Sequence, residues 1–494
     1  MNRISILFIF LISSFSVLLH SQTDTEAYRL SISTPIGTAR NLGVGNSMFA
    51  IGPDFSAIGS NPAGIGGFGR SEFLFTGSFL TSNQTSALNA DRSDQTKDNF
   101  GSFTFPNIGF VLFNRPQNSK WNTSNWAIGL NRMADYHREI QYAGNTIGSM
   151  TDAWRENANG TAPDDLNGFE EGLAYSSGGI YDFEEDNIYE TDYNLSPQYA
   201  LRKQEAVLSE GGKSELFLGY GADYNQKILF GFTVGMPFVN FTQNRIYEEM
   251  DGPDDGVPYF NSLQYNSYVN TTGYGWNGKL GVTWKPTKKI NVALAVHTPT
   301  KLFLTDNYNT TVTYNYTDNA HDGPITSESP YGSFQYALRT PWSGMAGLGV
   351  VIRTSGFFGA SVKLTNYSNM KYDYSVRGNG NYYDTIEREV NDDIKQNFAT
   401  SLQLNLGGEY VLDQFRVRGG ASFAESPYKN DGGFDPSFHA GVGYRQENYY
   451  VDLGYAWTQQ EEGYQPYETR EAAQPSVITD LSHHRISATV GVKF

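Results

Sequence analysis

The last ten residues of the chain impose the strongest constraint on its fold. Five apolar residues share one face of this segment and alternate strictly with small, polar or charged residues on the other: Ile486, Ala488, Val490, Val492 and Phe494. A period of two is typical of a β-strand whose two faces meet different surroundings. The same alternation recurs at 279–285, 401–406, 415–423 and 451–458. The chain therefore predicts a sheet of many strands, each with one apolar face.

The connections between the predicted strands favour a closed barrel over a sandwich. We place about fourteen strands between residues 71 and 494, and every second connection is short, as at 225–227 and 412–414. The other connections are mostly long, polar and acidic, and the longest covers residues 142–213. Short turns at one end and long loops at the other are typical of bacterial membrane barrels with an even number of strands. The sequence thus predicts an all-β fold, a 14-stranded antiparallel transmembrane β-barrel.

One part of the longest loop has helix signals. Ser196 is a suitable N-cap, Pro197 suits a first turn, and Gly211 and Gly212 would end the helix. A helix that covers the mouth of the barrel and a plain surface helix are both compatible with this pattern.

Composition narrows the class of protein. Aromatic residues make up 15% of the 494 residues, yet the mean hydropathy is -0.45, which fits a wall that is apolar outside and polar inside. The formal net charge of -17 argues against a nucleic-acid partner. The absence of cysteine excludes disulfides and thiolate metal sites.

Residues 1–21 have the pattern of an export signal. Arg3 supplies the positive start, an apolar stretch follows, and Ser21 is a small residue before a predicted cut at Gln22. No later run of about 18 apolar residues occurs, so no transmembrane helix is predicted in the mature chain. An exported chain of this kind can cross a membrane only as a closed barrel. We therefore expect it in the outer membrane of a Gram-negative bacterium.

The segment before the strands is dense in Gly, Ala and Ser, above all at 35–70. It has too little side chain to build a large core of its own. Small residues do allow its backbone to approach a surrounding wall closely. Residues 22–70 are therefore predicted to form a plug inside a barrel made of residues 71–494.

Short runs within this plug resemble the amino-terminal hatch of the FadL/TodX family of outer-membrane proteins. Gly43 and Gly45 begin a run that ends in Phe-Ala, Asp54 opens an acidic-x-Ser-Ala step, and a triplet follows that consists of Asn61, Pro62 and Ala63. The stretch 273–282 is similar to a Gly- and aromatic-rich strand of the family. The terminal Phe494 resembles the signal that such barrels present to their assembly machinery.

The resemblance implies a channel for passive uptake of hydrophobic compounds, such as long-chain fatty acids or aromatic hydrocarbons, with no enzymatic activity. It implies that the ligand leaves sideways, past the hatch, through a gap made by an inward kink in the third strand. The alternation of that strand loosens over four residues, where we place the kink: Arg132, Met133, Ala134 and Asp135. Three arginines are expected to face the lumen and to be available for a substrate carboxylate: Arg132, Arg416 and Arg418. The alternative for each is an ion pair with a neighbouring lumen carboxylate.

The same resemblance leads to expectations about partners and to alternative functions. We expect contact with outer-membrane lipid and lipopolysaccharide, assembly through Phe494, and a monomer. A haemin-receptor-like barrel, a secretion-associated barrel and a general polar porin are the alternative functions. The seven histidines are scattered and no metal-ligand or catalytic spacing is present, so we expect no cofactor and no metal.

Overall fold

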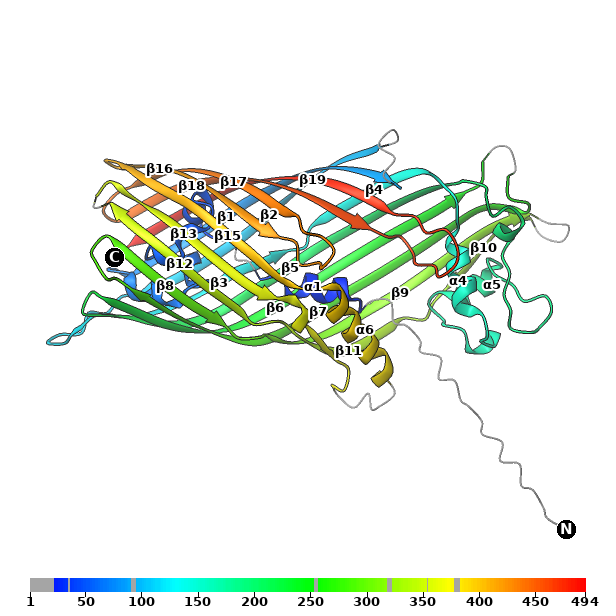
Figure 1. Cartoon of the computed structure of the whole chain (residues 1–494), viewed down its shortest axis with the longest axis horizontal. Helices are drawn as coiled ribbons and strands as arrows, with labels where there is room; N and C mark the ends of the chain where they lie inside the picture. The colour runs from blue at the N-terminus through cyan, green and yellow to red at the C-terminus, as the bar shows by residue number, and fades with distance from the viewer. Residues whose placement is uncertain are drawn as a thin grey trace, which may run out of the picture.

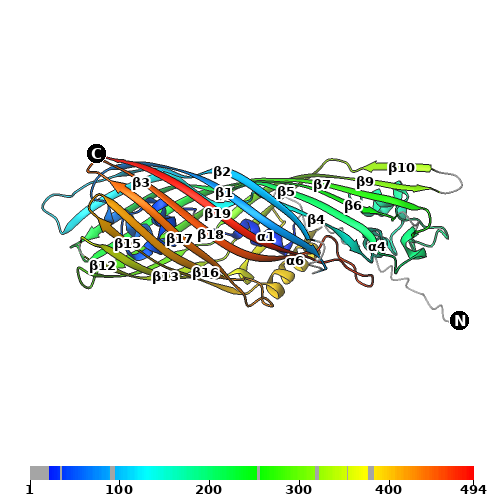
Figure 2. The ribbon, with the colours of Figure 1, turned by 90° about the horizontal axis from the view of Figure 1, so that it is seen from above.

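The computed structural model describes residues 22–33, 36–89, 95–252, 256–317, 322–352, 354–376 and 383–494. The predicted export signal at 1–21 lies outside them. Within the described residues, the strands form a single antiparallel sheet that closes on itself (Figures 1 and 2). Its nineteen segments are β1 Glu72–Leu88, β2 Gln95–Leu112, β3 Trp121–Asp135, β4 Arg138–Thr146, β5 Leu201–Tyr224, β6 Ile228–Met250, β7 Phe260–Trp284, β8 Ile290–His297, β9 Lys301–Thr317, β10 Asp322–Glu328, β11 Gly332–Arg339, β12 Ser343–Ile352, β13 Gly356–Asn366, β14 Lys371–Asp373, β15 Thr400–Leu412, β16 Phe415–Glu425, β17 Phe434–Arg445, β18 Tyr449–Tyr464 and β19 Val477–Lys493.

These segments make fourteen crossings of the barrel, which confirms the predicted number. Four crossings are interrupted, so that β3 continues into β4, β8 into β9, β10 into β11 and β12, and β13 into β14. The registers show this continuity: β7 pairs with β8 and then with β9, while β9 pairs with β10 and β11 in turn. The barrel closes where β1 pairs with β19 from Glu72↔Lys493 to Leu88↔Val477.

Short and long connections lie at opposite ends of the barrel, as predicted. We call them the turn end, where Phe494 lies, and the loop end, where α4 (Met150–Ala158) and α5 (Glu171–Ser177) lie (Figure 1). The crossings are unequal in length: β5, β6 and β7 have 24, 23 and 25 residues, whereas β16 has 11.

The longest loop is shorter than predicted, and its predicted helix is wrong. Strand β4 extends to Thr146 and β5 begins at Leu201, so residues 147–200 form the connection and 201–212 are strand. Residues Arg202 to Ser209 pair with β4 on one side and β6 on the other. Two ladders of backbone hydrogen bonds outweigh the local helix signals of Ser196 and Pro197, since tertiary pairing overrides propensity.

The barrel is apolar outside and polar inside. On β19, Ile486 and Val490 are 54% and 49% exposed, whereas the intervening Ser487 and Thr489 are fully buried. The core of a soluble sandwich would bury the apolar face instead, so this inversion fits a wall surrounded by lipid. Among the described helices, none has the length and apolar character needed to cross a membrane.

Five short helices of the hatch lie in the lumen. They are α1 Asp24–Ser31, α2 Ala39–Gly43, η1 Ser47–Ala50, α3 Phe55–Ile58 and η2 Pro62–Gly67. Helix α2 contacts β16 to β19, η1 contacts β8, β12, β13 and β15, and η2 contacts β3, β5, β6 and β7. Contacts with strands around the whole circumference are possible only from inside (Figure 2).

Glycines of the wall allow the hatch backbone to lie directly on the strands. A Cβ atom on Gly420 of β16 would lie 2.4 Å from the carbonyl carbon of Val44 and 2.6 Å from the nitrogen of Gly45. On the opposite wall, a Cβ on Gly231 would lie 2.2 Å from the carbonyl oxygen of Pro62. The small residues of the hatch and of the wall thus complement each other.

This packing gives a first prediction. The substitution Gly420→Ala should loosen the hatch, because overpacking of a close contact costs about 1–3 kcal/mol. We expect a higher baseline ion conductance of the purified protein in planar lipid bilayers. Gly344→Ala in β12 is the matched control, since a Cβ there meets no atom within 4 Å. Equal conductance of both variants and the wild type would contradict tight seating at Val44 and Gly45.

Candidate functional site

The predicted hatch residues hold the short helices together. Asp54 caps α3: its carboxylate accepts hydrogen bonds from the Ser56 amide at 3.1 Å and from the Thr38 hydroxyl at 2.9 Å. Asn61 caps η2 by accepting from the Ala63 amide at 3.1 Å. Its side-chain nitrogen donates to the Phe49 carbonyl at 2.9 Å and to the Thr283 hydroxyl of β7 at 3.1 Å. The Asn-Pro-Ala triplet therefore ties the end of the hatch to the wall.

A buried ladder of charges fixes the other side of the hatch. Arg40 of α2 donates to Glu409 of β15 through Nε and Nη2, both at 2.9 Å. Glu409 also accepts from Arg418 at 2.7 Å, and Arg418 reaches Asp452 at 2.7 Å. Asp452 in turn pairs with Arg445 at 3.0 Å. Arg418 is thus engaged by two carboxylates, the alternative weighed for it in the sequence analysis.

Below this ladder, the turn end holds a cavity of about 460 Å³. Charged side chains dominate its lining, which includes Arg40, Asp54, Glu72, Arg445 and Lys493. A hydrophobic molecule bound among these charged groups would displace the water around them and offer no hydrogen bonds in its place. This end of the lumen is therefore unsuited to a hydrophobic molecule.

The third crossing is interrupted where the sequence places a kink. Pairing between β2 and β3 ends at Asn107↔Asn131, and the β3–β5 register shifts between Arg132 and Ala134, which leaves Met133 as the extra residue. Beyond that point, residues 95–104 of β2 pair with β1 alone, residues 105 and 106 lie in a bulge, and β4 pairs with β5 alone. We call this unpaired length, residues 95–106 of β2 opposite 132–146 of β3 and β4, the seam. Pro106 at its start has no N–H to donate across it.

Side chains, not backbone bonds, close the seam. The rings of Phe100 and His137 stack with centroids 6.2 Å apart. Asp135 lies 2.6 Å from Nδ1 of His137 and 3.7 Å from both Arg132 and Arg485. These contacts can rearrange without loss of a strand ladder.

The lumen beside the seam carries unsatisfied polar groups next to an apolar surface. The side chains of Asn107 and Asn131 are 2% and 1% exposed, and their amide groups have no hydrogen-bond partner in the described part of the chain. Below them, the ring of Phe55 from α3 lies against Gly109 and Gly129. Asp54, as the cap of α3, positions this ring.

The three arginines proposed for a substrate carboxylate do not converge. Arg132 donates to the Gly211 carbonyl at 2.5 Å beside the seam. Arg416 donates to the carbonyls of Asp413 and Phe415, at 2.7 Å and 2.8 Å, in a turn at the turn end. Arg418 belongs to the charge ladder.

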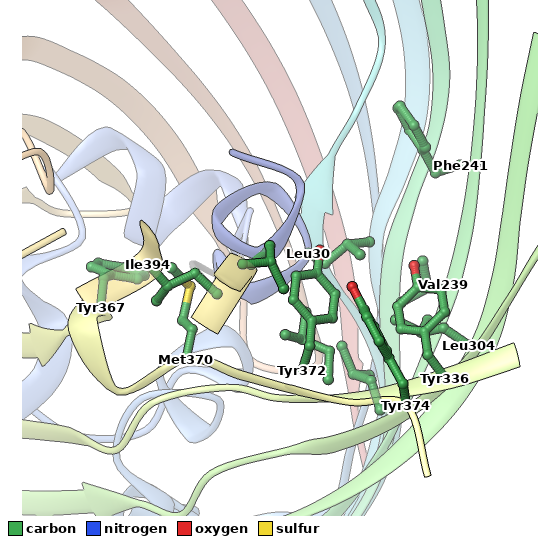
Figure 3. Packing of buried hydrophobic residues seen from close by; sticks show 14 of the residues in the cluster. Leu30, Val239, Phe241, Leu304, Tyr336, Tyr367, Met370, Tyr372, Tyr374 and Ile394 are labelled. Atoms are coloured by element: carbon green, nitrogen blue, oxygen red, sulfur yellow. The ribbon is translucent and has the colours of Figure 1, made fainter. Parts of the chain in front are cut away.

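An aromatic cluster fills the middle of the lumen around α1 (Figure 3). Leu30 of α1 points into a group of tyrosines and aliphatic side chains from the wall and from α6 (Asp384–Asn397). The labelled members include Tyr336, Tyr372 and Tyr374. The chain's own helix therefore occupies an apolar part of the lumen, and Ala134 of the seam belongs to the same cluster.

Lysines that the sequence analysis did not select surround the end of α1. Lys213 of β5 donates to the Leu30 carbonyl and Lys363 of β13 to the Ser33 carbonyl, each at 2.8 Å. Lys279 of β7 forms an ion pair with Glu215. Lys213, Lys279 and Lys363 thus lie near one another in this part of the lumen, and Glu215 lies beside Lys213 and Lys279. They come from distant strands, and only their alternation with outward apolar residues marks them as lumen groups.

The loop end of the lumen is filled by α4 and α5. Trp154 of α4 packs in a cluster with Tyr265 of β7 and Tyr314 of β9. Burial raises the pKa of the Asp152 carboxyl in α4 to about 6, although Arg155 lies 3.8 Å away. Nowhere in the described ranges do three His, Cys, Asp or Glu side chains gather as a metal site would require.

Comparison with solved structures identifies the fold. A FadL homologue of Pseudomonas aeruginosa superposes with a TM-score of 0.55 at 14% sequence identity, over 94% of this chain and 100% of that chain. The toluene transporter TodX of Pseudomonas putida gives a TM-score of 0.49 at 12% identity, over 94% and 100% of the two chains. No protein-family model and no curated protein sequence matches the chain. The first superposition shows that the chain has the fold of a FadL-type barrel.

The charge ladder gives a second prediction. Glu409→Gln leaves Arg40 and Arg418 facing each other without their shared carboxylate, and removal of one partner of a buried ion pair costs about 3–5 kcal/mol. We expect this loss in the free energy of unfolding, measured by urea titration in lipid vesicles. The control is Glu447→Gln, which removes the exposed partner of another hatch arginine, Arg70. That change should cost about 0–1 kcal/mol, and a similar loss in both variants would contradict the structural role of Glu409.

Proposed function

We propose that this protein is an outer-membrane channel for the passive uptake of hydrophobic compounds, with lateral release through the seam. The observation that carries the proposal is the seam itself. There, two neighbouring strands of the wall are not joined by backbone hydrogen bonds, and the apolar centre of the lumen lies beside them. The turn end would face the periplasm and the loop end the exterior. We further propose that the barrel works as a monomer among outer-membrane lipid and lipopolysaccharide and is assembled through Phe494.

Solvation supports a lateral exit over an axial one. A hydrophobic compound that continued along the axis would have to pass the hatch and then the charged cavity at the turn end. Transfer of apolar surface into such surroundings is unfavourable, whereas transfer from the aromatic cluster into lipid is nearly free of cost. The exit therefore belongs where the apolar lumen adjoins the bilayer.

The seam satisfies the mechanical requirement for such an exit. Elsewhere, separating neighbouring strands would break backbone hydrogen bonds in lipid, and each unsatisfied group costs several kcal/mol. At the seam the contacts that must rearrange are between side chains: the stacking of Phe100 on His137, the charges around Asp135, the Arg138–Glu462 ion pair and the packing of Tyr142 on Leu88. The wall can therefore open there without loss of a strand ladder.

The lysines near α1 favour an amphiphilic substrate with a carboxylate, such as a long-chain fatty acid. Lys213 and Lys363 now donate to carbonyls at the end of α1. If α1 moves to admit a ligand, these two ammonium groups lose their acceptors in the lumen. A carboxylate would replace them with charge-assisted hydrogen bonds. Aromatic hydrocarbons would use the same apolar cluster without this contact.

A third prediction tests the exit. Deletion of Met133, the extra residue at the seam, should restore a regular β3–β5 register and reduce uptake of labelled oleate and toluene by whole cells by about tenfold or more. Deletion of Asn122, the extra residue of the other irregularity in the β3–β5 register, is the matched control and should leave uptake unchanged. Heat-modifiable migration in gels would show that both variants fold. Unchanged uptake in folded Met133-deleted protein would reject lateral release.

A fourth prediction tests the substrate class. The double substitution of Lys213→Met and Lys363→Met should reduce oleate uptake by about tenfold and leave toluene uptake near the wild-type value, because only oleate has a carboxylate. Lys371→Met, at an exposed position of β14, controls for the loss of positive charge. Equal oleate uptake with and without the wild-type protein would reject the proposed transport. An equal loss for both compounds would instead show that the lysines act through the hatch.

A further inference from the structure

Asp306 of β9 is a buried carboxylate, and within the described residues its hydrogen bonds come from neutral groups. It is 1% exposed. One oxygen accepts from the Thr271 hydroxyl at 2.7 Å and from the Tyr336 hydroxyl at 3.1 Å. The other accepts from the side-chain amide of Gln22 at 2.5 Å. In the described part of the chain, no lysine, arginine or histidine forms an ion pair with Asp306.

The charges close to this carboxylate do not compensate it. Arg29, the arginine of α1, pairs with Glu26 at 2.7 Å and lies over the ring of Phe241. Glu26 and Asp24 add negative charge in the first turn of the same helix. A buried ion without a counter-ion is strongly unfavourable, and proteins normally pair such groups.

Gln22, which donates a hydrogen bond to Asp306, is also the first residue after the predicted export signal. Cleavage there is hydrolysis by a leader-cleaving protease. The C–N bond between Ser21 and Gln22 breaks, water gives its hydroxyl to the Ser21 carbonyl carbon, and the nitrogen of Gln22 takes a proton. The new α-amino group has a pKa of about 7.7–8.0 in the absence of other influences and binds a further proton at neutral pH. Processing therefore creates a cation in the residue already in contact with Asp306.

We propose that Asp306, Thr271 and Tyr336 form a receptor site for the processed amino terminus of this chain, in which the α-ammonium of Gln22 is the counter-ion of Asp306. The adjacent residue is held as well, because the Tyr372 hydroxyl donates to the Thr23 carbonyl at 3.0 Å. Thr23 is the N-cap of α1, so the site holds the start of this helix within the aromatic cluster (Figure 3). The helix is thus locked into the lumen only after export and cleavage.

Intact mass and hydrogen exchange of the full chain, expressed with its leader and purified from outer membranes, test this site. The mass should correspond to a chain that begins at Gln22 with a free amine. Asp306→Asn should raise the exchange rate of the α1 amides by about tenfold or more, because one charge of a buried pair is lost. Asp373→Asn, which removes a partly exposed carboxylate, is the control and should leave α1 unchanged.

Two further variants separate the α-ammonium from the Gln22 side chain. An alanine inserted between Ser21 and Gln22 moves the charge away by one residue and should raise exchange as much as Asp306→Asn does. Gln22→Ala keeps the α-ammonium in place and should retain wild-type protection. The reverse result, protection lost in Gln22→Ala and kept with the insertion, would show that the side chain is what is bound and would overturn the proposal.

Measurements on the wild-type protein alone can also refute the proposed site. A mature chain that begins elsewhere, or one whose terminal glutamine has cyclised with loss of ammonia, has no α-ammonium at this site. In the folded protein the Gln22 amine should react with an amine-acylating reagent about tenfold more slowly than after denaturation, as expected for a buried group. Equal reactivity would refute the ion pair even if Asp306→Asn does not fold.

Discussion

The structure depends on one requirement, that backbone polar groups in contact with lipid must be hydrogen-bonded within the protein. Closure of β1 on β19 meets this requirement around almost the whole wall, over a ladder of seventeen residue pairs. The seam is the exception, and it is local: β2 stays paired with β1 on both sides of one bulge, and β5 keeps its ladders with β4 and β6. Among the described residues of β2, β3 and β4, the cost of an unpaired strand edge thus falls at the seam, beside the apolar lumen.

The hatch solves a second problem, how to fill a wide barrel without a conventional core. Its helices have between four and eight residues, too few to be stable alone, and their caps and close contacts with wall glycines replace the missing packing. Arg40 and Asn61 attach the hatch to opposite walls through polar groups. Such bonds are directional, whereas the aromatic cluster adds contact area around α1, whose two ends are held by hydrogen bonds from Lys213 and Tyr372. The lumen therefore combines a plug that lies directly on the wall at the turn end with a helix, α1, that is surrounded by apolar side chains and held by polar contacts at its ends.

Alternation and connection length were enough to predict the barrel and its fourteen crossings, because the two faces of each strand meet chemically different surroundings. The strand ends were less predictable. Residues 201–212 have helix signals, but pairing with β4 and β6, invisible to local reasoning, makes them strand. In the candidate site, loosened alternation pointed to residues 132–135, where the register does shift. Lys213, Lys363 and Asp306 could not be selected, since their significance lies in contacts with the hatch across more than a hundred residues of sequence.

The unequal strand lengths have a consequence for where the molecule first meets its surroundings. A strand of 25 residues, such as β7, extends about 80 Å at 3.3 Å per residue, whereas about ten tilted residues suffice to cross a bilayer. Even when inclined, β5, β6 and β7 must stand far above the hydrocarbon, whereas the wall made by β15, β16 and β17, with 13, 11 and 12 residues, ends much lower. The rim of the barrel at the loop end is therefore oblique: the wall is tall on the side of β5, β6 and β7 and low on the opposite side.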